Sequence, residues 1–199
     1  MAVLNEAEAG DDPLVFFRRW FLEAGISSVD EINAMTLATV DGTGQPHARI
    51  VLLKGIDENG FTFFTNYNSA KGQELESDPL VAAVFFWKEL ERQVRIEGFA
   101  EKVDRAESDE YFASRPLGSR LGAWSSPQSQ VIPSRELLES NYKLYETQYN
   151  DNVPRPPHWG GYRIKPHRIE FWQGRSNRMH DRILFIYDGG QWSKCRLAP

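Results

Sequence analysis

The hydrophobic period of this chain changes from helical to alternating at Met35, and that change limits the folds it can adopt. Residues 12–25 begin with the Asp-Pro pair of a helix N-terminus, carry apolar residues at helical spacing and end at a glycine, which predicts a helix. The alternating stretches that follow are MTLATVD, HARIVLLKGID and FTFFTN. Because short turn-like connections join them, we expect these three strands to form an antiparallel meander.

Strands and helices both continue through the rest of the chain. Helices are predicted at SAKGQELES, which Ser69 can cap, and at RAESDEYFAS and SRELLESNYKLYETQY. DPLVAAVFFW is typical of a buried strand, and further strands are predicted at RQVRIEGFAEKV, WGGYRIKPHRIEFWQG, RILFIYD and QWSKCRL. About seven strands with three or four helices favour the mainly β, α+β class, as a closed or nearly closed antiparallel barrel with flanking helices. We expect a single domain over residues 11–199, after a flexible N-terminus over residues 1–10.

Composition and charge exclude several classes of protein. A formal net charge of −5 disfavours general binding to nucleic acid or to an anionic membrane, so an anionic ligand needs a local cluster of cations. The single cysteine, Cys195, cannot form an internal disulfide, and the acidic N-terminus does not resemble a signal peptide, which predicts a cytoplasmic protein. No apolar run approaches the roughly 20 residues of a membrane span, and the four histidines lack the spacing of a metal site.

Three side chains around Pro116 form a candidate phosphate clamp. Tyr111 and Arg115 are four residues apart on a predicted helix, and Ser119 lies just beyond Pro116, where that helix must stop. All three side chains can donate hydrogen bonds to phosphate oxygens. The alternative is an ordinary helix C-terminus with an arginine near the negative end of the helix dipole.

Two other segments carry polar groups suited to a ligand. Arg49 and Lys54 lie at the ends of RIVLLK and point to opposite faces of the strand, so they serve different groups or are simply solvated strand ends. Residues 125–130, SSPQSQ, offer donors and acceptors for the polar edge of a cofactor, although loops commonly have this composition.

The segment EFWQGRSNRMHDR gathers cationic and aromatic side chains near the end of the chain. After a turn at GRSN, a strand that starts near Met179 is expected to place Arg178, His180 and Arg182 on one face. Such a face suits an anionic or electron-rich ligand. The alternative is a hairpin held by ion pairs to Asp181 and Glu170.

A series of motifs along the chain resembles one enzyme family. In order, RIVLLK, FFTN, ERQVRIEG, YFASRP, QSQ, WGGYRI, the segment around RMHDR and the terminal RLAP are similar to the pyridoxine (pyridoxamine) 5'-phosphate oxidase family. The resemblance extends from about Asp11 to Pro199. It implies the FMN-binding split barrel, an antiparallel Greek-key barrel with flanking helices, and a homodimer with FMN in clefts at the subunit interface.

The resemblance also implies which residues form the site. It implies cofactor-binding residues at Arg49, Ile50, Val51, Leu52, Leu53, Lys54, Phe64, Thr65, Lys71, Gln93, Gln128, Ser129, Trp172 and Arg182. The residues implied for the substrate phosphate are Lys54, Tyr111, Arg115 and Ser119. Arg178 and His180 are implied to bind the substrate ring and to act as the catalytic residues.

The chain departs from the family pattern in two places. Ala70 stands where members commonly have an arginine near the FMN phosphate. Many members also carry a basic, tyrosine-containing segment ahead of the first helix that can cover the site, whereas MAVLNEAEAGD precedes it here.

The implied reaction oxidises pyridoxamine 5'-phosphate or pyridoxine 5'-phosphate to pyridoxal 5'-phosphate. A hydride leaves C4' of the substrate for N5 of the flavin, and molecular oxygen is reduced to hydrogen peroxide. Two alternatives remain open. One is a related flavin oxidase of another ring substrate, as in phenazine biosynthesis, which should dispense with the phosphate clamp. The other is a non-catalytic protein that binds FMN or pyridoxal phosphate.

Overall fold

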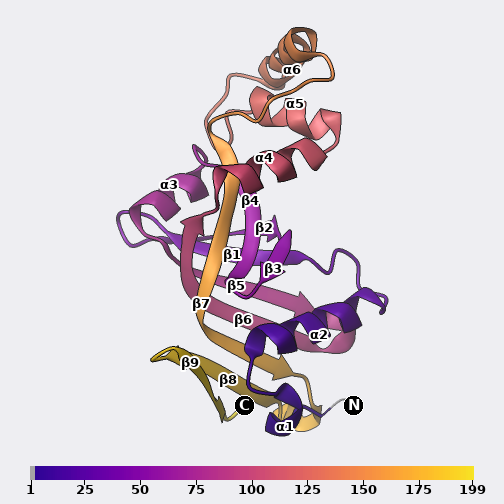
Figure 1. Ribbon diagram of the computed structural model, residues 1–199, viewed down its shortest axis with the longest axis vertical. Coiled ribbons are helices and arrows are strands. Elements are labelled where there is room, and N and C mark those ends of the chain that lie inside the picture. The colour runs from indigo at the N-terminus through magenta and orange to yellow at the C-terminus, as the bar shows by residue number, and fades with distance from the viewer. Residues whose placement is uncertain (1–2) are drawn as a thin grey trace.

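Alternating apolar residues organise the chain into one curved antiparallel sheet with helices at its ends (Figure 1). The structure, a computed structural model, describes residues 3–199. Within that range, seven of the nine strands follow the order β2-β1-β5-β6-β7-β4-β3; β8 pairs with β7, and β9 pairs with β8. The strands are β1 (Ala34–Val40), β2 (Pro46–Leu52), β3 (Gly55–Asp57), β4 (Gly60–Asn66), β5 (Leu80–Trp87), β6 (Arg92–Lys102), β7 (Trp159–Gln173), β8 (Asp181–Asp188) and β9 (Gln191–Arg196).

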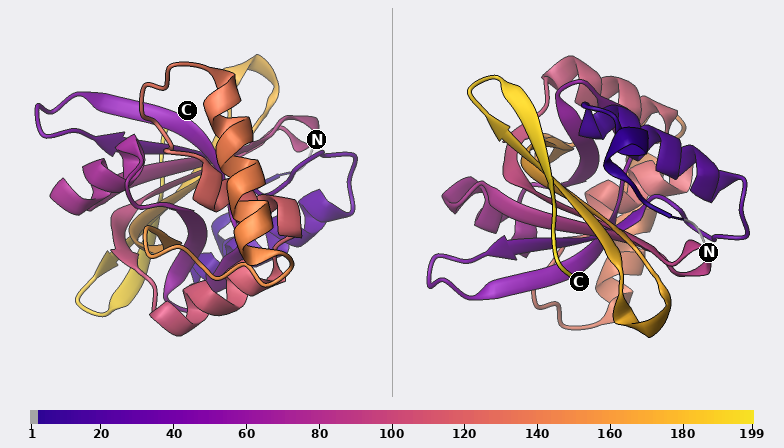
Figure 2. Two further views of the ribbon diagram at one scale, coloured as in Figure 1. Left: turned by 90° about the horizontal axis from the view of Figure 1, so that it is seen from above. Right: turned by 90° about the horizontal axis from the view of Figure 1, so that it is seen from below.

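The helices lie at the ends and along the side of the sheet. The α-helices are α1 (Glu6–Ala9), α2 (Pro13–Gly25), α3 (Ala70–Ser77), α4 (Arg105–Ser114), α5 (Leu117–Ser125) and α6 (Arg135–Tyr149), and two short 3-10 turns are η1 (Lys88–Leu90) and η2 (Ser176–Arg178). Helices α4, α5 and α6 lie together at one end of the molecule, with α6 outermost in the view from above, whereas α1 and the β8–β9 hairpin lie at the opposite end (Figures 1 and 2). None of the helices described over residues 3–199 combines the length and the apolar character needed to cross a membrane.

The sheet curls where two consecutive peptide groups form backbone hydrogen bonds to residues near opposite ends of the strand order. The N–H of Leu53 donates to the carbonyl of Asn33, and the N–H of Lys54 donates to the carbonyl of Thr62, both at 2.8 Å. Asn33 precedes β1, whereas Thr62 lies in β4 near the other end of the sheet. The chain therefore joins the two sides at this seam, and the predicted barrel with flanking helices is confirmed as a half-barrel.

The same seam corrects the predicted meander. The stretch HARIVLLKGID is not one strand but two, β2 and β3, which lie at opposite ends of the strand order. The physical reason is the side chain of Leu53, which is 4% exposed in the core, while most of β2 is exposed. Turning Leu53 inward ends β2 and directs the next residues toward β4.

Most predicted helices and strands are confirmed, and the differences are local. The helix over residues 12–25 forms with Asp12 as its cap, which accepts from the N–H of Leu14 at 2.8 Å. Helix α5 was not predicted from the sequence. Strand β5 is buried on one face only, because Leu80 and Phe86 are 57% and 58% exposed.

Residues 3–10, which were predicted to be flexible, lie against the last strand. The guanidinium of Arg196 forms two 2.8 Å bonds to the carboxylate of Glu6, and the ammonium of Lys194 donates to the carbonyl of Gly10 at 2.6 Å. Leu4 is buried. The prediction took no account of these contacts because their partners lie at the far end of the sequence, and residues 1–2 lie outside the described residues.

We expect Phe17→Ala to lower the free energy of unfolding by about 3 to 5 kcal/mol, the usual cost of emptying a core aromatic site. Phe17 is fully buried, and its ring lies 4.9 Å from that of Phe61 and 5.0 Å from that of Phe85. Urea unfolding followed by circular dichroism measures the change. Val15→Ala, on the exposed side of the same helix, is the control, and equal losses in both variants would contradict this packing.

Candidate functional site

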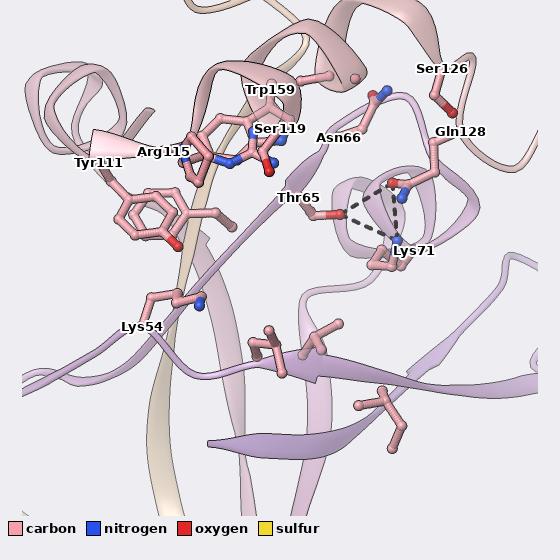
Figure 3. A pocket seen from close by; sticks show the side chains of 17 residues that line it. Lys54, Thr65, Asn66, Lys71, Tyr111, Arg115, Ser119, Ser126, Gln128 and Trp159 are labelled. Carbon is pink, nitrogen blue, oxygen red and sulfur yellow. Dashed lines mark hydrogen bonds between the residues drawn. The ribbon is translucent and has the colours of Figure 1, made fainter. Parts of the chain in front are cut away.

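A cavity of about 620 Å³ opens between the sheet and helices α4 and α5 (Figure 3). Three cationic side chains line it: Lys54 from the seam, Lys71 from α3 and Arg115 from the junction of α4 and α5. Among the 17 described residues that line it, none is an aspartate or a glutamate. In a chain with a net charge of −5, this locally positive cavity suits an anionic ligand.

Lys71 forms the most enclosed cationic group of the cavity. It is 9% exposed, and its ammonium donates to the side-chain oxygens of Thr65 and Gln128 at 3.3 Å each, both of them neutral (Figure 3). Burial, and then the positive charge of Arg49, lower the pKa of Lys71. A buried ammonium is stabilised by an opposite charge, so an anion bound in the cavity would favour the charged form of Lys71.

The predicted phosphate clamp lies in this cavity, but not on one helix face. Helix α4 ends at Ser114, and Arg115 has an extended backbone with φ −74° and ψ 147°. The reason is Pro116, since the residue before a proline is disfavoured in the helical conformation. Ser119 then lies in the first turn of α5 rather than in a loop. Tyr111, Arg115 and Ser119 all line the cavity.

The guanidinium of Arg115 has a buried Nη1, and no carboxylate of residues 3–199 forms an ion pair with it. It lies 4.6 Å from the centre of the Trp159 ring, and its Nη1 makes no hydrogen bond to any described residue. Burial lowers the pKa of Arg115. Phe64 stacks on Tyr111 at 3.9 Å and lies parallel to Trp159, so the arginine rests on an aromatic wall. A buried donor without a partner in such a wall points to a ligand oxygen as its partner.

Arg49 lies outside the cavity lining. Its Nη2 donates to the carboxylate of Glu74 at 2.8 Å, and its Nη1 donates to Thr39. Glu74 is 7% exposed, so this ion pair is nearly buried. Ala70, the first residue of α3, is exposed and carries no charge. The cation that α3 supplies to the cavity is therefore Lys71.

The cavity gathers part of the predicted site and adds residues that the sequence did not indicate. The predicted residues in its lining are Ile50, Val51, Leu52, Lys54, Phe64, Thr65, Lys71, Tyr111, Arg115, Ser119 and Gln128. The additional residues are Asn66, Pro116, Gly122, Ala123, Ser126 and Trp159. Of these, Ser126 belongs to the polar loop over residues 125–130, and Asn66, Pro116 and Trp159 belong to the motifs FFTN, YFASRP and WGGYRI. Gly122 and Ala123 had no signal in the sequence. Leu53 is turned into the core, and Ser129 follows Gln128 in a left-handed conformation with φ 71°.

A second group of predicted residues lies side by side across three strands. Gln93 of β6 pairs with Trp172 of β7, and Trp172 pairs with Arg182 of β8. Directly paired residues of antiparallel strands point to the same face of the sheet. We call Gln93, Trp172 and Arg182, together with Arg178 and His180 of the adjoining turn, the distal cluster.

Arg178 and His180 occupy a turn rather than the predicted strand. Residues 176–178 form η2, and β8 begins only at Asp181, so Arg178 and His180 do not alternate with Arg182. Arg178 has a φ of 61°, a left-handed conformation that is costly for a residue other than glycine. The Nδ1 of His180 accepts from the N–H of Arg175 at 3.1 Å, and its ring lies 4.6 Å from that of Trp172.

The cavity and the distal cluster lie at opposite ends of β7. Trp159, the first residue of this strand, lines the cavity, and Trp172 belongs to the distal cluster. The separation of 13 positions along the strand corresponds to roughly 40 Å, and Figure 1 shows β7 running from beside α4 toward the end that holds β8 and β9. One chain therefore does not bring the two groups together. Among residues 3–199, no group of three histidine, cysteine or acidic side chains is arranged to hold a metal ion.

Two family models match the chain. Residues 23–149 match the model described as pyridoxamine 5'-phosphate oxidase, and residues 159–199 match the pyridoxine 5'-phosphate oxidase C-terminal dimerisation region. A pyridoxine/pyridoxamine 5'-phosphate oxidase of Pseudomonas putida is 59% identical over 199 residues, which cover 98% of this chain and 93% of the relative. One of Cupriavidus necator is 57% identical over 197 residues, with the same coverage.

Solved structures share the fold. PhzG from Burkholderia lata, in complex with tetrahydrophenazine-1-carboxylic acid, has a TM-score of 0.94 and 30% identity, and the match covers 100% of this chain and 98% of that one. A pyridoxamine 5'-phosphate oxidase-related, FMN-binding protein from Nostoc punctiforme has a TM-score of 0.76 and 19% identity, with coverage of 96% and 99%. The half-barrel is therefore the fold of the FMN-binding split barrels.

Inorganic phosphate should raise the melting temperature of the ligand-free protein, because the described residues that line the cavity include three cations and no carboxylate. At a concentration ten times its dissociation constant, the stabilisation is about 1.4 kcal/mol. Arg115→Gln should lose much of this shift in a thermal melt at constant ionic strength. Arg135→Gln, at an exposed arginine of α6, is the control; equal shifts in both variants would mean that phosphate acts elsewhere.

Proposed function

The chain belongs to the pyridoxamine 5'-phosphate oxidase family, and we propose that it is a cytoplasmic, homodimeric oxidase of pyridoxamine 5'-phosphate or pyridoxine 5'-phosphate. The products would be pyridoxal 5'-phosphate and hydrogen peroxide, with FMN as cofactor and molecular oxygen as the electron acceptor. The observation that supports this proposal best is the cavity with three cations and no carboxylate among its described lining residues. Both the substrate and the cofactor carry a phosphate that such a cavity suits.

The residues around Lys71 fit the phosphate of FMN. The buried ammonium has only neutral partners among the described residues, so an anion beside it would supply the missing counter-charge. Thr65 and Gln128 would hold the same group through hydrogen bonds, and the backbone of residues 50–52 lies along the cavity. When bound, FMN supplies the acceptor for the hydride of the substrate and passes the electrons to oxygen.

The substrate phosphate would bind at the other side of the cavity. Arg115 offers the buried Nη1 that lacks a partner among described residues, and Lys54 lies near Tyr111 in Figure 3. Ser119 adds a hydroxyl in the first turn of α5, where the free N–H groups of the helix favour an anion. These four side chains would fix one end of the substrate and so determine where its ring can lie.

Arg178 and His180 would act on the ring end of the substrate. The left-handed backbone of Arg178 is a strained feature of the kind found at functional sites. Because Nδ1 of His180 accepts a hydrogen bond, a neutral imidazole carries its proton on Nε2 and can donate from there to a substrate oxygen or nitrogen. Arg178 would orient the ring and stabilise charge near C4'.

A second copy of the chain would supply the distal cluster to each cavity. Phe86 pairs with Gln93, so Phe86, Gln93, Trp172 and Arg182 share one face of the sheet. Phe86 and Ile50 on this face are 58% and 62% exposed, and exposed apolar side chains favour an interface. A two-fold dimer through this face would place the distal cluster of one protomer beside the cavity of its partner.

The runner-up is an oxidase of a different ring, as in phenazine biosynthesis. The similarity to PhzG in the phenazine complex gives it support. The higher identity to the vitamin B6 phosphate oxidases, and the presence of Lys54, Tyr111, Arg115 and Ser119 in the cavity, favour the phosphorylated substrate. The third alternative is a protein that binds FMN or pyridoxal phosphate without turnover.

Anaerobic mixing of the FMN-loaded protein with pyridoxamine 5'-phosphate should abolish the flavin absorbance at about 450 nm and give pyridoxal 5'-phosphate. Arg178→Gln should slow this step about 100-fold, because a misplaced ring loses its alignment. Pyridoxamine, which lacks the phosphate, is the matched control and should react far less. Reaction only with an unphosphorylated ring would favour the runner-up, and no reaction despite bound FMN would favour the non-catalytic alternative.

Mixing two inactive variants tests whether each site is built from two chains. Arg115→Gln damages the cavity, and Arg178→Gln damages the distal cluster. In a mixed dimer, one of the two sites keeps both native halves, so random association should restore about a quarter of the native activity. The measurement is peroxide formation after the two variants are co-refolded. No recovery above the separate variants would mean that both residues act within one chain.

A further inference from the structure

Glu170 is a buried carboxylate near the C-terminal end of β7, between two arginines. It is 6% exposed, and its two oxygens accept from Nε of Arg182 at 2.7 Å and from Nη1 of Arg95 at 3.1 Å. Burying a carboxylate is unfavourable unless it is paired. Two arginines compensate Glu170, and one of them, Arg182, belongs to the distal cluster.

The end of the chain holds Arg182 from its other side. Nη1 of Arg182 donates to the carbonyl of Ala198 at 2.9 Å, and the N–H of Leu197 donates to the carbonyl of Arg182 at 3.0 Å. Within residues 3–199, Nη2 of Arg182 makes no hydrogen bond, which leaves it as the donor available to a ligand. The hydrogen bond to Glu170 also raises the pKa of Arg182, so the guanidinium stays positively charged.

A neighbouring carboxylate, Glu97, provides a control that distinguishes a positioning role of Glu170 from a merely structural one. Glu97 of β6 also bridges two arginines, Arg95 at 3.2 Å and Arg168 at 3.5 Å, and it lies on the same face of the sheet. Glu97 does not touch Arg182, and its side chain is 36% exposed. Loss of either carboxylate removes two ion pairs, and the two carboxylates share Arg95, but only Glu170 bonds directly to a residue of the distal cluster.

We propose that Glu170, together with the carbonyl of Ala198, is a positioning residue for the flavin site: it fixes the guanidinium of Arg182 so that Nη2 meets FMN. The proposal rests on the proposed function, in which Arg182 contacts FMN. A free arginine samples many rotamers, and holding it at Nε and Nη1 before binding removes the entropy that a flexible side chain would lose.

Titration of the flavin-free dimer with FMN, followed by quenching of flavin fluorescence, tests the proposal. Glu170→Gln should raise the dissociation constant about tenfold, in line with loss of a charge-assisted hydrogen bond. Glu97→Gln should change it less than about twofold. Combining Glu170→Gln with Arg182→Lys should weaken binding no further than Arg182→Lys alone, because Glu170 acts through Arg182.

The outcomes are distinct. Additive losses in the double variant, or equal losses in Glu170→Gln and Glu97→Gln, would reduce Glu170 to a structural role and overturn the proposal. If the native dimer binds FMN and Glu170→Gln binds it equally well, the proposal alone falls. If the native dimer does not bind FMN at all, the proposed function is contradicted, and the positioning role of Glu170, which rests on it, is contradicted as well.

A second variant keeps the test decisive if Glu170→Gln does not fold, as judged by circular dichroism. Deleting Ala198 and Pro199 removes the carbonyl that holds Nη1 of Arg182 and leaves Glu170 in place. The proposal expects weaker FMN binding in this truncated dimer, and unchanged binding would contradict it.

Discussion

Strand β7 is the element on which the rest of the molecule depends. It pairs with β4 along its first half, with β6 along most of its length and with β8 along its second half. Its length fixes the distance between the cation-lined cavity at Trp159 and the distal cluster at Trp172. Since hydrogen bonds on both sides hold the strand in register, one chain cannot shorten this distance, which is why the proposed function places a second copy at each site.

Local signals predicted most of the secondary structure, because caps and hydrophobic periods act over a few residues. The cap Asp12 and the cap Ser69 are examples. The seam at Leu53 could not be predicted in this way. Its two backbone hydrogen bonds go to opposite sides of the half-barrel, and nothing in the strand sequence distinguishes a continuous strand from one that turns inward. Similarly, the contacts that hold Glu6 come from the end of the chain.

The site was predictable in its residue types but not in its geometry. Tyr111, Arg115 and Ser119 do meet in one cavity, although the helix-face reasoning for them was wrong. The signal that could have corrected it was Pro116, which disfavours a helical Arg115. The turn at Arg178 had no such signal, because its left-handed conformation is set by the surrounding contacts. The separation of cavity and distal cluster follows from strand register, which single motifs do not encode.

The position of the two half-sites at opposite ends of β7 has a genetic consequence. In the proposed dimer, the cavity and the distal cluster of one chain serve different catalytic centres. A chain damaged at one end impairs a single centre when it pairs with a native chain. A chain damaged at both ends impairs both centres when it pairs with a native chain, so two mutations on one gene copy would act as a dominant negative. The same two mutations on separate gene copies would complement each other.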